Sequence, residues 1–80
     1  MNRRRFAGYV KHESDDFDYV VECEANNYGV TWFATVFRGA EIRGHPNGIV
    51  DGVEMAHPEL ERVLNDIVAK SIRDRVGVRV

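Results

Sequence analysis

The sequence predicts an α+β domain in which an antiparallel β-meander of 3–5 strands is covered on one face by a single C-terminal amphipathic helix. Three observations predict it. The last third of the chain carries an apolar stripe with helical spacing. The first two thirds hold β-branched and aromatic stretches separated by turn residues. The chain has 80 residues, 44% of them hydrophobic, and a net charge of only −2, which is typical of one folded domain. We therefore expect a single domain over residues 1–80, with strands within about 4–53 and a helix over about 58–75.

The helix is the best-defined element. Its apolar residues recur at spacings of three, one and four, which places them on one face of a 3.6-residue helix: Leu60, Val63, Leu64, Ile67, Val68, Ile72 and Val76. Pro58 suits the first turn because proline has no N–H to leave unpaired there. Gly77 is expected to end the helix as its left-handed residue.

The strands are predicted from composition and from the turns between them. Tyr19–Ala25 and Val30–Arg38 are rich in residues that favour strands, and Asn26–Gly29 lies between them as a turn. Gly39 suits the first central position of a type II′ hairpin turn. The remaining predicted segments are a first strand over Arg4–His12, an acidic loop over Glu13–Asp18, a turn over His45–Gly48 and a short strand over Ile49–Val53.

The predicted register separates two faces of the sheet. If Asn26–Gly29 closes the hairpin, Cys23 lies opposite Trp32 on a continuously apolar face that the helix should cover. The opposite face pairs Glu22 with Phe33 and holds a second apolar cluster, formed by Val20, Phe33, Phe37 and Ile42.

One helix covers only one face of a sheet, so this second cluster requires its own explanation. A contiguous exposed apolar patch usually marks an interface. We expect Val20, Phe33, Phe37 and Ile42 to form the interface of a homodimer. The alternative is that a bulge or a twist buries Phe37 and Ile42 beneath a loop.

Composition bears on the cellular setting. The single cysteine cannot form a disulfide within one chain, which favours a reducing compartment. Neither a signal-peptide apolar segment nor a run of about 18 apolar residues is found, so we expect a cytoplasmic protein without membrane contact. Arginine outnumbers lysine nine to two, a bias typical of GC-rich bacterial genomes.

Catalytic, metal and cofactor chemistry has no recognisable pattern. His12, His45 and His57 lie far apart, whereas zinc ligands usually occur in closely spaced pairs. Cys23 has acidic neighbours, which disfavour a reactive thiolate. We therefore expect a non-enzymatic protein without a metal or cofactor.

Nucleic acid is the alternative partner. Sheet aromatics beside arginine can stack on bases, and the candidate contacts are Arg3, Arg4, Arg5, Lys11 and Arg38. Two features oppose weak RNA binding by this surface. The pI is near 5.9, and Glu22 and Glu24 share the face with the aromatics.

Two families show a limited resemblance. Gly29–Val36 resembles the second strand of HicB-type antitoxins, although the Pro-Gly-Cys-like segment and the Thr-x-x-Glu-Ala helix entry of that family are missing. The order β-β-β-α is similar to the end of the double-stranded-RNA-binding domain, but Glu59 and Glu61 stand where that family has a lysine cluster. Neither resemblance implies a function here. The sequence predicts a protein-interaction or homodimerisation module.

Overall fold

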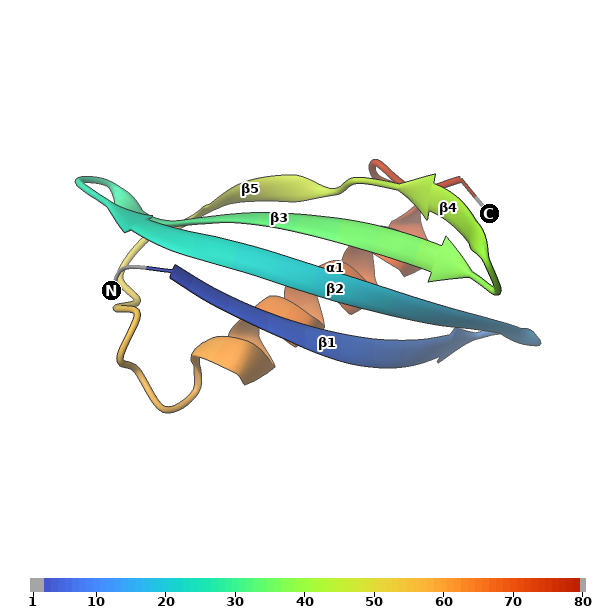
Figure 1. Ribbon diagram of the computed structural model, residues 1–80, viewed down its shortest axis with the longest axis horizontal. Coiled ribbons are helices and arrows are strands. Elements are labelled where there is room, and N and C mark those ends of the chain that lie inside the picture. Colours follow the sequence, from blue (N-terminus) through green and yellow to red (C-terminus); the bar gives the residue numbers. More distant parts are fainter. Residues whose placement is uncertain (1–2, 80) are drawn as a thin grey trace.

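The computed structural model describes residues 3–79, and a helix lies against one face of a curved antiparallel sheet (Figure 1). The elements are β1 (Arg3–His12), β2 (Asp15–Asn26), β3 (Gly29–Arg38), β4 (Glu41–Gly44), β5 (Asn47–Val50) and α1 (Leu60–Asp74). The sheet order is β1-β2-β3-β4, and β5 also pairs with β3. The predicted α+β class, with the strands first and one C-terminal helix packed on them, is confirmed.

The predicted register between the two central strands is confirmed residue by residue. Asn26 and Gly29 are paired at the turn, so Ala25 lies opposite Val30 and Cys23 lies opposite Trp32. A short loop leaves little freedom in this pairing, and the period of two then assigns every side chain to a face. Gly39 has a φ of 62°, as the predicted turn between β3 and β4 requires.

The prediction of an acidic loop over residues 13–18 is wrong. Strand β2 begins at Asp15, and only Glu13 and Ser14 connect it to β1. The ladder between β1 and β2 extends to the pair His12 and Asp15. Asp16 and Asp18 are accommodated because they alternate with Phe17 and Tyr19, which are buried, so these two carboxylates point away from the core. Asp15 lies at the end of the strand, where it pairs with Arg38.

The predicted turn at His45–Gly48 is also wrong. Strand β5 already begins at Asn47, and it runs antiparallel to β3 with Val50 opposite Val30. β4 and β5 are thus two parts of one interrupted edge strand along β3. Pro46 lies at the interruption, where the missing N–H does no harm to the ladder, and its carbonyl accepts a hydrogen bond from the Ala34 N–H at 2.9 Å.

The helix runs within the predicted range, but its end differs from the prediction. Arg75, with a φ of 58°, is the left-handed residue that ends α1, rather than Gly77. The N–H of Val76 donates to the Ser71 carbonyl at 2.9 Å, and the N–H of Arg75 donates to that of Ile72 at 3.3 Å, which is the Schellman pattern. Gly77 instead begins a tail that returns to the sheet, where Val78 bridges to Gly44.

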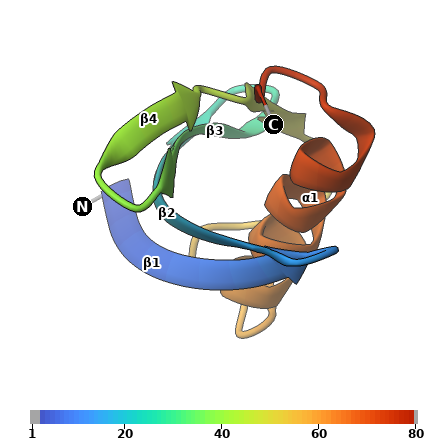
Figure 2. The ribbon, with the colours of Figure 1, turned by 90° about the vertical axis from the view of Figure 1, so that its right-hand side faces the viewer.

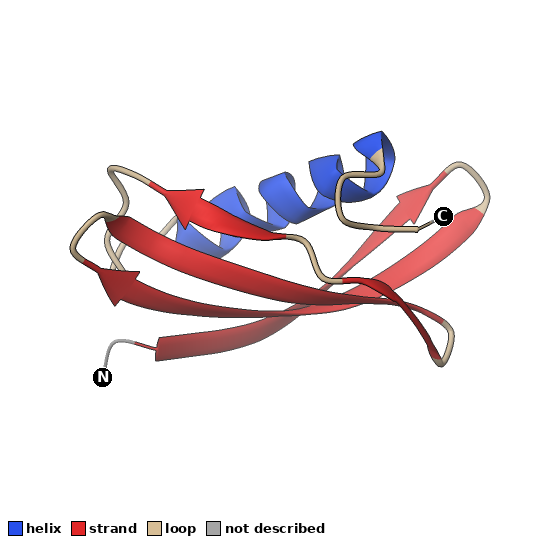
Figure 3. Cartoon of the chain, turned by 90° about the horizontal axis from the view of Figure 1, so that it is seen from above, coloured by secondary structure: helices blue, strands red, loops and turns tan. Residues whose placement is uncertain are grey.

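The core lies between the sheet and α1, as Figure 2 shows from the end of the molecule. Leu60, Leu64, Val68 and Ile72 of the predicted stripe are fully buried along one side of the helix. Val63 and Ile67 are half-buried, and the inclusion of Val76 is wrong, because it lies beyond the end of α1 and is 62% exposed. They meet the inner face of β2 and β3, whose buried residues are Phe17, Tyr19, Val21, Cys23, Val30, Trp32, Ala34 and Val36. Seen from above, the helix lies on one side of the strands only (Figure 3), so the other sheet face has no covering element among the described residues.

Candidate interaction surface

The outer face is the sheet surface turned away from α1. The register places five cross-strand rows on it, each starting from β1. The rows are Arg3–Glu24–Thr31–Ile49, Arg5–Glu22–Phe33–Asn47, Ala7–Val20–Thr35, Tyr9–Asp18–Phe37–Ile42 and Lys11–Asp16. Charged residues therefore gather on β1 and β2, whereas apolar residues gather on β3, β4 and β5.

The structure brings the predicted interface residues onto this one face. Phe33 is 43% exposed and Ile42 is 47% exposed, while Val20 and Phe37 are half-buried. Phe37 lies opposite Ile42, although the ladder shifts register between Val36 and Phe37. That irregularity does not bury either side chain beneath a loop.

Two further exposed residues extend the surface. Ile49, which is 56% exposed, lies opposite Thr31 on the same face, and Tyr9, 58% exposed, lies on β1. Ile49 is not among the interface residues predicted from the sequence, because the sequence alone does not show which strand pairs with the last one. Its position on a strand edge became clear only once β5 was placed against β3.

His45 lies beside the aromatic residues. Its ring stacks on Phe33, with 5.1 Å between centroids and 18° between planes. Its Nδ1 lies 3.4 Å from the Thr35 hydroxyl. His45 and Pro46 form the break between β4 and β5, and the imidazole of His45 lies over Phe33 at this break. His45 thereby covers one face of the Phe33 ring, and the exposed remainder of the ring is accessible to a partner.

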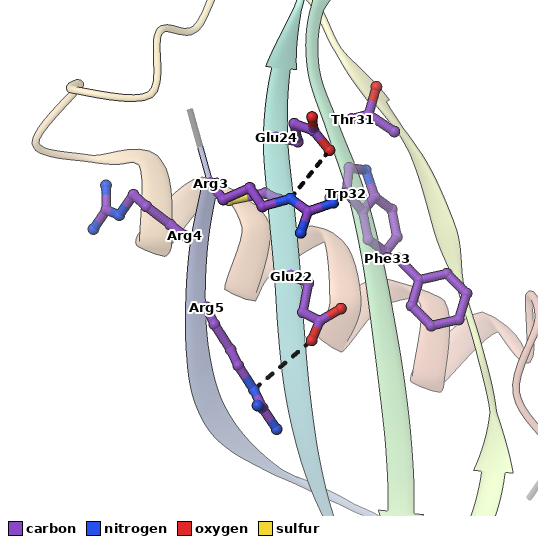
Figure 4. A pocket seen from close by; sticks show the side chains of 9 residues that line it. Arg3, Arg4, Arg5, Glu22, Glu24, Thr31, Trp32 and Phe33 are labelled. Atoms are coloured by element: carbon purple, nitrogen blue, oxygen red, sulfur yellow. Dashed lines mark ion pairs between the residues drawn. The ribbon is translucent and has the colours of Figure 1, made fainter. Parts of the chain in front are cut away.

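The charged half of the outer face is internally paired. Arg3 Nε lies 3.5 Å from Glu24 Oε2, and Arg5 Nε lies 3.9 Å from Glu22 Oε1 (Figure 4). These four side chains, with Thr31 and Phe33, border a shallow depression of ≈ 430 Å³. All four ionic groups are more than half exposed, so each pair contributes only about 0–1 kcal/mol to stability. Their larger effect is to balance the charge of the surface.

The other candidate nucleic-acid contacts are dispersed. Arg4 points to the helix side, where it forms an ion pair with Glu61 and donates to the Met55 carbonyl at 3.1 Å. Arg38 forms an ion pair with Asp15 at the far end of the sheet, with 2.6 Å between Arg38 Nη2 and Asp15 Oδ1. Lys11 shares the outer face with Arg3 and Arg5, opposite Asp16. The five cations therefore do not form one basic stripe.

Two groups, one on the outer face and one on the inner face, have raised pKa values. The Tyr9 hydroxyl donates to Asp16 at 2.5 Å, and this hydrogen bond to a carboxylate raises the pKa of Tyr9. Cys23 lies on the inner face as predicted, and burial raises the pKa of its thiol. A buried, protonated thiol is a poor nucleophile.

No group of three or more His, Cys, Asp or Glu side chains within residues 3–79 is arranged to hold a metal ion. Within the same residues, no helix has the length and apolarity needed to cross a membrane.

Comparison with known proteins adds no relative. No protein-family model, curated protein or solved structure matches the chain.

Proposed function

We propose that the protein is a non-enzymatic interaction module that forms a homodimer through the outer face of its sheet. The observation that carries the proposal is the exposure of Phe33, Ile42 and Ile49 on a face that α1 leaves uncovered. Apolar side chains aligned on one sheet face lose water contact together when a second apolar face meets them.

The layout of the face favours a second copy of the chain as the partner. A two-fold axis parallel to β3, between β3 and the β4–β5 edge, would place the exposed apolar residues of β3, β4 and β5 in one copy on those of the other. The charged residues of β1 and β2 would then lie at the rim, where they keep their water. An apolar centre with a polar rim is the usual anatomy of a protein interface.

Charge and size are compatible with this arrangement. Arg3 and Arg5 are already neutralised by Glu24 and Glu22, so two such faces approach without strong repulsion. Seen face-on, the chain measures 37 × 20 Å. The area of such a face is close to the roughly 800 Å² per partner of a standard interface. The mixed charge also explains why this face suits protein better than a polyanion.

Sedimentation equilibrium of three proteins tests the proposal. We expect the unmodified chain to dimerise and Phe33→Ser to weaken association at least about tenfold, because a central apolar contact costs over 1 kcal/mol when truncated. Tyr28→Ser is the matched control, since Tyr28 is 78% exposed at the turn between β2 and β3, away from the face. A chain that stays monomeric at millimolar concentration contradicts the proposal, as does equal weakening by the two substitutions.

A further inference from the structure

Strand β1 forms an open edge of the sheet. It pairs with β2 along all ten of its residues. No strand within residues 3–79 pairs with its other side. Alternate residues of an edge strand direct their N–H and C=O groups away from the neighbouring strand. Such a row of backbone groups is a template for one further strand. The opposite edge differs, because it is divided between β4 and β5 and bent at Pro46.

The charges of β1 and β2 are strictly separated. β1 carries Arg3, Arg4, Arg5 and Lys11 and no acidic residue. β2 carries only acidic charges, and Glu24, Glu22 and Asp16 lie opposite Arg3, Arg5 and Lys11. Along its paired edge, β1 therefore faces an acidic strand. Cross-strand pairs of opposite charge stabilise such a pairing.

We propose that the open edge of β1 binds an extended acidic segment of another protein by strand addition. The incoming segment would resemble β2 in chemistry, with carboxylates at every second position on the outer face and apolar residues between them. Backbone hydrogen bonds would supply the affinity, and the cations of β1 would select the charge of the partner. Arg3 and Arg5 can serve both neighbours, because their side chains are 79% and 71% exposed.

A second copy of β1 is a poor occupant of this edge. Antiparallel pairing of two β1 strands would bring the Arg3–Arg5 end of one copy beside Lys11 and His12 of the other. Like charges directly opposite each other destabilise a strand pair. The cations that would attract an acidic strand, Arg3, Arg5 and Lys11, therefore also discourage self-association at this edge, which leaves it available in the face-to-face dimer proposed above.

A synthetic peptide with the sequence of Asp15–Asn26, carrying serine in place of cysteine, is a suitable probe. We expect it to bind the intact protein, and a peptide with lysine at all five acidic positions to bind at least about tenfold more weakly. Titration followed by amide NMR should shift the resonances of β1 rather than those of β5. Methylation of alternate backbone nitrogens in the acidic peptide should abolish binding, because strand addition uses those groups.

Two triple variants separate this edge from the overall charge. Arg3→Gln/Arg5→Gln/Lys11→Gln should weaken binding of the acidic peptide about tenfold. Arg62→Gln/Lys70→Gln/Arg73→Gln, with the same change in net charge but on α1, should leave it unchanged. Phe33→Ser should also leave it unchanged, so that failure of the dimer and failure of this site are distinguishable. Circular dichroism of each variant checks that the fold is retained.

Three outcomes would overturn the inference. The first is equal binding of the acidic and lysine peptides. The second is the absence of amide shifts on β1 at millimolar peptide. The third is tighter binding of a single-stranded oligonucleotide than of the acidic peptide at low salt, which would assign the cations of β1 to phosphate instead.

Discussion

The phenol ring of Tyr19 lies directly over Gly8 on the neighbouring strand. The two residues are cross-strand partners on the inner face of β1 and β2, and a Cβ atom on residue 8 would overlap the ring. The missing side chain lets the ring cross β1 and reach α1, where the Tyr19 hydroxyl donates to Asn65 Oδ1 at 2.7 Å. Gly8 therefore permits the hydrogen bond between Tyr19 of β2 and Asn65 of the helix. The Tyr19 ring in turn covers the space that a side chain at residue 8 would fill.

Gly8→Ala should destabilise the fold by about 1–3 kcal/mol, because the added methyl displaces Tyr19 from its packed position and breaks the bond to Asn65. Urea denaturation measures the effect. In a Tyr19→Ala background the same substitution should cost nothing or stabilise slightly, since alanine suits a strand better than glycine. Equal costs in the two backgrounds would show that the ring and the glycine are not coupled.

Stability should fall as the pH rises above about 9. Burial raises the pKa of the Cys23 thiol above its ordinary value of 9.0, and burial followed by the charge of Asp66 raises that of Tyr19 above 10.0. Both groups are neutral when protonated, so the folded state holds these protons more tightly than the unfolded state. Their contribution is complete below the ordinary values and is lost as the pH rises through the folded ones.

Denaturation midpoints measured between pH 7 and 11 test this dependence. Cys23→Ala should remove the part of the decline that begins near pH 9, and Tyr19→Phe should remove the part that begins near pH 10. A decline that is unchanged in both variants would assign it to other groups.

Leu64→Asp should unfold the protein. Leu64 is fully buried between α1 and the sheet, and an unpaired carboxylate there costs more than about 4 kcal/mol, which is comparable to the whole stability of a small domain. Arg73→Asp, on the exposed side of the same helix, should cost only about 1 kcal/mol. Circular dichroism and amide NMR distinguish the two, and a folded Leu64→Asp protein would mean that α1 does not pack through this stripe.

Arg75→Gly should stabilise the protein by about 0.5–1 kcal/mol. Arg75 ends α1 with a positive φ, a conformation that is strained for any residue with a Cβ and free for glycine. Arg73→Gly, two residues earlier and inside the helix, should instead destabilise by about 1 kcal/mol. Thermal denaturation of the pair checks both signs, and destabilisation by Arg75→Gly would contradict the assigned helix end.

The predictions that succeeded depend on neighbouring residues. The helix stripe and the hairpin between β2 and β3 follow from periodicity and from a short turn, so Phe33 was placed on the outer face correctly. The charge of Glu13–Asp18 suggests a loop, but only Glu13 and Ser14 form one, because the segment from Asp15 onward alternates with the buried Phe17 and continues as a strand. The predicted helix end at Gly77 is wrong, although glycine is the usual helix terminator. Gly77 lies in the tail beyond Arg75, where its backbone packs against Pro46.

The sequence by itself determined which side chains share a face, because a strand repeats every two residues and a helix every 3.6. Only the tertiary structure decided that β5 pairs with β3 and that Arg4 forms an ion pair with Glu61, since both depend on contacts between residues far apart in the chain. It also decided that β1 is left with an open edge. Local pattern gives each strand two equivalent edges, and only the assembled sheet distinguishes the paired edge from the free one.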